Sequence, residues 1–231
     1  MITVRGLHKR FGKLSVLEGI DLEIDSPGII TILGPNGSGK TTLIKCLLGM
    51  AIPDKGSLIF NGKDILGEWD YRNEISYMPQ IARFPPNLKV IELFNMIKNL
   101  RRGGGDDGAL IAAFKLEPVL DKKLSTLSGG TAQKVNIVLT FMFDSPVIIL
   151  DEPTTGLDPV ALLRFKKLIW EEKNKGKTIL ITTHIMSFVE EISDRIVFLL
   201  DGNIYFEGTV ADIKTQTGEN DLESAIATIL Q

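Results

Sequence analysis

The chain has 231 residues, of which 44% are hydrophobic, so it can bury an ordinary globular core in a single domain. Its formal net charge is −3 and it has no basic tail, which counts against non-specific binding of nucleic acid through phosphate neutralisation. The single cysteine, Cys46, excludes an internal disulfide and fits a reducing, intracellular setting.

The N-terminal residues predict a strand and not a leader peptide. No apolar run approaches the roughly 18 uninterrupted residues that are needed to span a bilayer. We therefore expect a soluble chain, for which any role at a membrane would come through a partner.

Strand-like alternation dominates the first thirty residues. Period-two patterning covers short segments between Ile2 and Ile24, with turn residues at Gly12-Lys13. The same pattern returns at 57–60, and the Asn61-Gly62 that follows is a strong hairpin signal. These segments predict a small antiparallel β layer.

A glycine-rich segment, Gly34–Thr41, lies between an apolar strand pattern at 29–33 and helical spacing at 42–48. The spacing fits a P-loop, in which backbone N–H groups surround the β-phosphate, Lys40 reaches the β and γ oxygens and the Thr41 hydroxyl ligates Mg²⁺. The start of the following helix also favours a polyanion. A turn that merely ends in Lys-Thr is the alternative, and the flanking strand and helix count against it. The motif alone predicts a nucleoside triphosphate with Mg²⁺ and leaves kinases, GTPases and motor ATPases open.

The pattern changes near residue 80, where prolines break the chain. Helical spacing follows at 90–100 and at 109–115, and the glycine-rich tract 101–108 between them is predicted to be a solvated loop because no strand precedes it. We expect a helical subdomain inserted into an α/β core. The predicted division is one domain at 1–231, with the core at 1–79 and 141–231 and the helical subdomain at 80–140.

An apolar run at 147–150 ends in Asp151-Glu152. Continuous apolar runs are typical of buried parallel strands, and adjacent carboxylates at a strand end suit both Mg²⁺ positioning and proton abstraction. Asp158 as N-cap and Pro159 as first helical residue then predict a helix. The remaining predicted elements are a strand at 178–182, a hairpin at 195–206 and a helix at 222–230.

Taken together with Leu127–Gly130, Gly156–Asp158 and His184, these motifs resemble those of the ATP-binding subunits of ABC transporters. The resemblance runs from Ile2 to Leu230. Two departures occur: Thr131 and Lys134 replace the usual Gln and Arg after the signature glycines, and Phe replaces the commoner Tyr as the adenine-stacking aromatic. The family motifs correspond to Phe11 (adenine stacking), Gly34–Thr41 (Walker A), Gln80 (Q-loop), Leu127–Gly130 (signature), Val147–Glu152 (Walker B), Gly156–Asp158 (D-loop) and His184 (switch histidine).

The resemblance implies an α/β fold, with a P-loop NTPase (RecA-like) core, a small antiparallel β layer and an inserted α-helical subdomain. It also implies a Mg-dependent ATPase whose cofactors are ATP and Mg²⁺. The implied catalytic residues are Glu152, His184, Lys40 and Gln80, and the implied Mg²⁺ ligands are Thr41, Gln80 and Asp151. The implied nucleotide-binding residues are Phe11, Val16, Gly34, Pro35, Asn36, Gly37, Ser38, Gly39, Lys40, Thr41, Thr42, Ser128, Gly129 and Gly130.

In the implied mechanism, two subunits pack head to tail, and each ATP lies between one P-loop and the partner's signature motif. The dimer would be a homodimer or a pair with a paralogous subunit, bound to a separately encoded integral-membrane permease. That places it in the cytoplasm, on the inner face of the cell membrane, with export as the favoured direction and no nucleic acid as partner.

Other functions stay open at this point. A soluble ABC-type ATPase of DNA repair would need a long coiled-coil insertion, and one of translation usually carries two such domains in one chain. A P-loop kinase would have no use for Leu127–Gly130. Phe11 could instead be a core aromatic, and His184 a helix cap. Trp69 and Trp170 are interpreted as packing residues.

Overall fold

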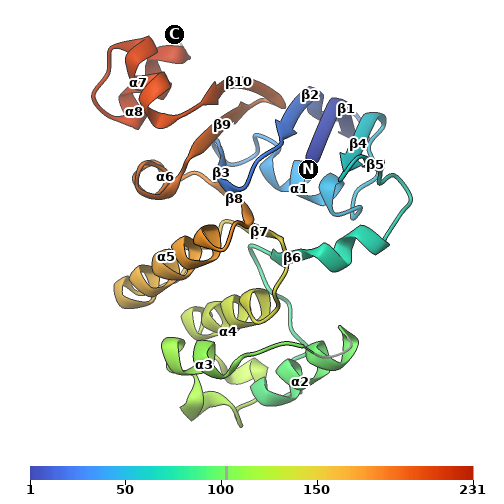
Figure 1. Ribbon diagram of the computed structural model, residues 1–231, viewed down its shortest axis with the longest axis vertical. Coiled ribbons are helices and arrows are strands. Elements are labelled where there is room, and N and C mark those ends of the chain that lie inside the picture. Colours follow the sequence, from blue (N-terminus) through green and yellow to red (C-terminus); the bar gives the residue numbers. More distant parts are fainter. Residues whose placement is uncertain (102–103, 231) are drawn as a thin grey trace. The chain divides into compact units, whose positions relative to one another are not determined.

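The computed structural model describes residues 1–101 and 104–230, and it divides into two compact units. The first unit comprises Met1–Arg72 and the chain from Thr178 onward, and the second comprises Asn73–Lys177 (Figure 1). Arg102 and Gly103, which belong to the glycine-rich tract, and Gln231 lie outside the described residues. The boundaries 80–140 of a helical subdomain stay a prediction.

The first unit contains the predicted antiparallel layer, which is confirmed. Its strands are β1 (Ile2–Phe11), β2 (Leu14–Ile24), β4 (Lys55–Phe60) and β5 (Lys63–Asp64), in the order β2-β1-β4-β5. The β1–β2 and β4–β5 turns fall at the predicted Gly12-Lys13 and Asn61-Gly62. Alternate residues such as Ile2 and Val4 are buried, as expected of a sheet with one face on a core.

Parallel pairing in the same unit joins β3 (Gly28–Leu33) to β8 (Thr178–Thr183) on one side and to β9 (Arg195–Leu200) on the other. β10 (Asn203–Gly208) completes the predicted hairpin with β9. Every residue of β3 and β8 is buried, as is typical of parallel strands that are covered on both faces.

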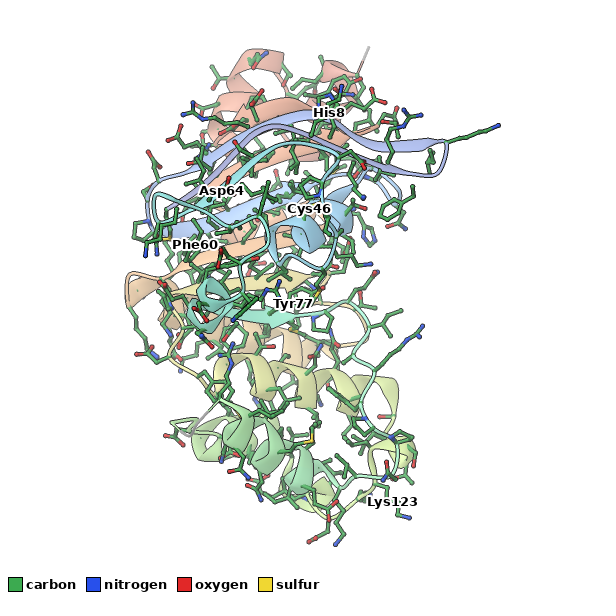
Figure 2. All side chains as sticks on the ribbon, turned by 90° about the vertical axis from the view of Figure 1, so that its right-hand side faces the viewer. His8, Cys46, Phe60, Asp64, Tyr77 and Lys123 are labelled. Atoms are coloured by element: carbon green, nitrogen blue, oxygen red, sulfur yellow. The ribbon has the colours of Figure 1, made fainter. Side chains whose placement is uncertain are left out.

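Helix α1 (Lys40–Leu47) follows β3 after the glycine-rich loop. Its buried residues include Leu43, Ile44 and Cys46, the last of which is labelled in Figure 2. Burial raises the pKa of the Cys46 thiol to about 11, with a small opposing effect from Lys9. Cys46 is therefore a packed, protonated thiol.

Three helices close the first unit: α6 (Met186–Ile192), α7 (Val210–Thr217) and α8 (Leu222–Ile229). The last pair forms the C-terminal hairpin (Figure 1). The hydrophobic core around these three helices includes Leu33 of β3, Val189 of α6, Ile213 of α7 and Leu222 of α8. The sequence predicted only α8 of these three helices.

The second unit contains the parallel strands β6 (Ile75–Met78) and β7 (Val147–Asp151). Strand β6 was not predicted. The helices of this unit confirm the predicted ones and add a further one, the helix of the signature region. They are α2 (Val90–Leu100), α3 (Gly108–Phe114), α4 (Gly129–Phe141) and α5 (Pro159–Asn174), with short 3₁₀ turns at Glu117–Val119 and Leu124–Thr126. A further 3₁₀ turn, Asp70–Glu74, spans the point in the chain where the first unit ends and the second begins.

The Arg101 side chain joins the end of α2 to β6 and to the segment that precedes β7. Its guanidinium donates to the Ile75 carbonyl over 2.5 Å and to the Ser145 hydroxyl over 3.3 Å, and it lies 4.7 Å from the centre of the Phe143 ring. Desolvation lowers the pKa of Arg101, but a guanidinium stays charged at any ordinary pH. The end of α2 thus lies beside β6.

The interpretation of the two tryptophans as packing residues is wrong for Trp69, which is 68% exposed. Trp170 is 38% exposed, and the Lys173 ammonium lies 4.4 Å from its ring centre.

Candidate functional site

The glycine-rich loop joins β3 to α1 in the first unit, as the P-loop pattern predicts. Lys40 is 5% exposed, and its ammonium donates to the carbonyls of Gly34 over 2.8 Å and of Pro35 over 3.0 Å. The lysine charge is therefore held against the loop itself. Ser38 has a buried hydroxyl with no hydrogen-bond partner among the described residues, which makes it a donor suited to a ligand oxygen.

Close packing explains the first glycine of the loop. A Cβ on Gly34 would lie 2.1 Å from the Leu199 carbonyl oxygen and 2.8 Å from the Ser38 hydroxyl. The Gly34 N–H also donates to the Thr183 carbonyl over 3.3 Å, at the end of β8. Only glycine lets the loop lie this close to β8 and β9.

Two of the predicted nucleotide-binding residues, Val16 and Phe11, lie on the antiparallel layer of the same unit. The Val16 carbonyl of β2 lies against Gly39, where an added Cβ would come within 2.8 Å. Phe11 stands at the β1–β2 turn, 53% exposed, with the Lys9 ammonium 5.1 Å from its ring centre. Its exposure rules out the core alternative and leaves a ring surface available for stacking.

His184 follows directly on β8, one residue after the Thr183 carbonyl that accepts from the loop. It is exposed, and the N-cap of α6 is Ile185, so His184 is not the cap residue. The Ile185 N–H donates to the Thr183 hydroxyl over 3.1 Å and fixes the turn between strand and helix.

The acidic pair lies in the second unit, at the end of β7. Asp151 is 1% exposed and Glu152 is 3% exposed. Glu152 has a φ of +48°, a left-handed conformation that is uncommon for a residue with a side chain and that clusters at functional sites. Burial, and to a lesser extent the Asp151 carboxylate, together raise the pKa of Tyr77 on β6 to about 12 (Figure 2).

Gln80 lies near the same edge of the second unit. Met78 pairs with Leu150 in parallel register, so the residues that follow both strands leave the sheet at one end. Gln80 follows Met78 by two residues and is exposed. The carboxyl ends of β6 and β7 thus bring Gln80 and the acidic pair to the same end of this pair of strands.

The signature motif begins α4. Ser128 is the N-cap, and its hydroxyl accepts from the Thr131 N–H over 3.3 Å. A Cβ on Gly130 would lie 2.8 Å from the Gly156 carbonyl oxygen, whereas one on Gly129 would meet nothing within 4 Å. The second signature glycine is thus required by packing against the D-loop segment, and the first is not.

Two buried polar residues of α4 were missed from the sequence. The Gln133 amide donates to the Pro153 carbonyl over 2.9 Å, and the Asn136 amide donates to the Pro79 carbonyl over 3.1 Å. They tie the signature helix to the segments after Glu152 and before Gln80. The available signal was the presence of Gln and Asn on the otherwise apolar, buried face of a helix.

Lys134, one of the two departures, pairs with the D-loop. Its ammonium donates to Asp158 over 2.6 Å, while the other oxygen of that carboxylate caps α5 by accepting from the Ala161 N–H over 2.8 Å. Both hydrogen bonds lower the pKa of Asp158, and the one from Lys134 has the larger effect. A lysine in place of arginine thus still reaches the acid.

This ion pair predicts a pH dependence. A carboxyl group with a lowered pKa in the folded state stabilises that state above its unfolded pKa of about 3.9, and the contribution is lost as the pH falls through the folded value. Asp158→Asn keeps a capping oxygen, so we expect a smaller acid-induced fall in Tm below about pH 4 than in the unmodified protein. Circular-dichroism melts between pH 2 and pH 7 measure this, with Lys134→Met as control for the ion pair alone. An unchanged pH profile for Asp158→Asn would contradict it.

The candidate residues are thus divided between the two units. The P-loop, Phe11, Val16 and His184 belong to the first, and Gln80, the signature residues and the acidic pair belong to the second. Among the described residues, no three His, Cys, Asp or Glu side chains form a group that could hold a metal ion. Within residues 1–101 and 104–230, no helix is both long enough and apolar enough to cross a bilayer.

A phosphate loop between a parallel strand and a helix, with a second apolar strand that ends in carboxylates, defines a P-loop NTPase. The ABC transporter family model matches residues 17–155. A Nod factor export ATP-binding protein I from Burkholderia orbicola (strain AU 1054) is 35% identical over 219 residues, which are 90% of this chain and 70% of that protein. A probable amino-acid import ATP-binding protein from Bacillus subtilis (strain 168) is 32% identical, and the match covers 92% of this chain and 91% of that protein.

Among solved structures, an ATP-binding subunit of an ABC transporter matches with a TM-score of 0.91 and 29% identity, over 100% of both chains. A dimeric bacterial ABC transporter cassette, 24% identical, has the same fold with a TM-score of 0.80. The chain therefore belongs to the ABC transporter family, as one of its ATP-binding ATPase subunits, and the predicted fold class is confirmed.

Proposed function

We propose that the chain dimerises head to tail around two Mg-ATP and powers a separately encoded integral-membrane permease, as an exporter. The observation that carries the proposal is the phosphate loop with its buried Lys40, held ready against the loop carbonyls. ATP hydrolysis is the activity of the family, and the coupling to a permease rests on the relatives that are named as transport subunits.

The predicted catalytic and signature residues have the following roles in this proposal. Lys40 and the loop N–H groups bind the phosphates, and the partner's Ser128 and Gly130 supply a hydroxyl and an N–H to the γ-phosphate. Glu152 polarises the attacking water, and His184 orients that water and the γ-phosphate. Gln80 connects the reaction to the segment that follows it.

The donor chemistry fits Mg²⁺, which prefers hard oxygen ligands and keeps several waters. The Thr41 hydroxyl lies in the first turn of α1, and the Asp151 carboxylate is buried at the end of β7. We propose these two residues and Gln80 as its ligands, directly or through water. When bound, Mg²⁺ neutralises charge on the β- and γ-phosphates.

Export as the direction rests on the names of relatives. One similar protein is a Nod factor export ATP-binding protein and another is a daunorubicin resistance ATP-binding protein, 33% identical over 94% of this chain. The probable amino-acid importer is a relative of similar identity. The proposed location is the cytoplasmic face of the cell membrane, and the dimer would be a homodimer or a pair with a paralogous subunit.

Phe11 offers a test of the adenine site. Its exposed ring would stack on the base, and base–aromatic stacking contributes about 1–3 kcal/mol in other complexes. Phe11→Ala should weaken ATP binding by this amount, and Phe11→Tyr should keep it. Because stacking does not select the base, GTP should bind as well. Calorimetric titration checks both; equal affinities for Phe11→Ala and the unmodified chain would remove Phe11 from the site.

The permease interface has its own experiment. After Gln80 the chain runs without regular structure to Lys89, and Ile81 there is 70% exposed, whereas Phe84 and Leu88 are half-buried. Single exposed apolar residues are ordinary on protein surfaces, so the choice of Ile81 rests on its position next to Gln80. Ile81→Glu should abolish co-purification with an integral-membrane protein from solubilised membranes of the source cells and preserve basal ATPase activity. If the unmodified chain fails to co-purify with it, the alternative, a soluble ABC-type ATPase, gains support.

A further inference from the structure

Helix α6 follows His184 in the chain and packs against α8 of the C-terminal hairpin α7–α8. It begins two residues after His184 and has only seven residues, Met186–Ile192. Helices this short are marginal by themselves, so their orientation is set by tertiary contacts. His184 lies in the turn that leads into α6, so the contacts that hold α6 also bear on the position of that turn.

Both ends of α6 are fixed to strands. At its start, the Ile185 N–H donates to the Thr183 hydroxyl of β8 over 3.1 Å. After its end, the Ser193 and Thr31 hydroxyls lie 2.6 Å apart, and Asp194 exchanges two hydrogen bonds with Ile29 of β3. One face is buried through Phe188, Val189 and Ile192. The two ends and the buried face of α6 are therefore all held by contacts with the rest of the unit.

Glu190 supplies a third contact, on the flank of α6. Its Oε1 accepts from the Leu222 N–H over 3.0 Å and lies 2.7 Å from the Lys214 ammonium. Leu222 is the first residue of α8, where the N–H groups have no partner within the helix and a negative charge is favoured. A single carboxylate thus joins α6 to both helices of the hairpin.

We propose that Glu190 is a positioning residue: it locks α6 to the C-terminal hairpin and thereby holds His184 in the orientation that ATP hydrolysis requires. This inference rests on the proposed role of His184. Glu190 itself touches no reacting group. Its contribution is to add contacts with Leu222 and Lys214 to those made by the two ends and the buried face of α6.

The test is a double-mutant cycle on ATP turnover in the full-length chain, with Glu190→Ala and His184→Ala alone and together. If Glu190 acts through His184, Glu190→Ala should lower kcat by about 2- to 30-fold and leave the affinity for ATP unchanged. In the His184→Ala background it should cause no further loss. Glu190→Gln keeps an oxygen that can accept from Leu222, so it should recover part of kcat.

A control separates positioning from stability. Asp221→Ala removes the N-cap of α8, which accepts from the Ser224 N–H over 2.8 Å, and leaves the Glu190 contacts in place. It should lower Tm without affecting kcat. A kcat loss for Glu190→Ala that is the same in both backgrounds, or no loss at all, would overturn the positioning role. A normal kcat for His184→Ala would instead remove His184 from the proposed mechanism, and this inference with it.

Discussion

Glu152→Gln is expected to lower ATP turnover by about 10²–10⁴-fold, the usual contribution of a positioned general base. The amide has nearly the same shape as the carboxylate, so Asp151 and the left-handed turn at the end of β7 should keep their structure. The substitution also removes one negative charge near the γ-phosphate and blocks the reaction that opens the proposed dimer. ATP-bound dimer should therefore accumulate.

Size-exclusion chromatography with ATP and Mg²⁺ measures the second effect. Lys40→Ala is the matched control, because it should fail at nucleotide binding and stay monomeric. Normal turnover by Glu152→Gln would remove Glu152 from its role. An inactive variant that stays monomeric at saturating ATP would count against the head-to-tail dimer of the isolated subunit.

Gly34→Ala should abolish nucleotide binding and lower stability. The added Cβ would lie 2.1 Å from a backbone oxygen of β9, so the loop, the strand or both must move. Overpacking of this kind costs about 1–3 kcal/mol, and each kcal/mol lowers Tm by about 2–4 °C in a chain of this size. Melting curves and ATP titration measure the two effects.

Gly129→Ala is the stability control, because its Cβ would meet nothing within 4 Å and its φ is not in the left-handed region. Its Tm should stay close to that of the unmodified protein. If Gly34→Ala binds ATP with normal affinity, the close contact with Leu199 is not what shapes the phosphate loop.

The features that were predicted from the sequence depend on local chemistry. Phosphate loops need glycine at fixed spacing, Asp158-Pro159 is a helix start by itself, and Asn61-Gly62 determines a hairpin turn. Each of these signals lies within a few residues of the structure it specifies. That is why the β layer, α1 and the start of α5 were predicted, although β1 and β2 are longer than the predicted segments.

The features that were missed depend on distant partners. Strand β6 has only four residues, and two of them, Ser76 and Tyr77, are polar enough to hide the strand pattern. Helix α6 has no side-chain cap. Gln133 and Asn136 acquire their roles from carbonyls 20 and 57 residues away, a relation that no local pattern contains. Helix α7 is different, since its Thr209–Asp212 capping box was visible in the sequence and was overlooked.

The burial of Cys46 has a practical consequence for measuring motion in this ATPase. With a pKa of about 11, roughly one Cys46 thiol in ten thousand is a thiolate at pH 7, and maleimide reagents react with the thiolate. As Cys46 is the only cysteine in the chain, a cysteine introduced at an exposed position would react selectively in the native background. Fluorophores placed in this way in each of the two units would report the distance between them through energy transfer as ATP binds and is hydrolysed.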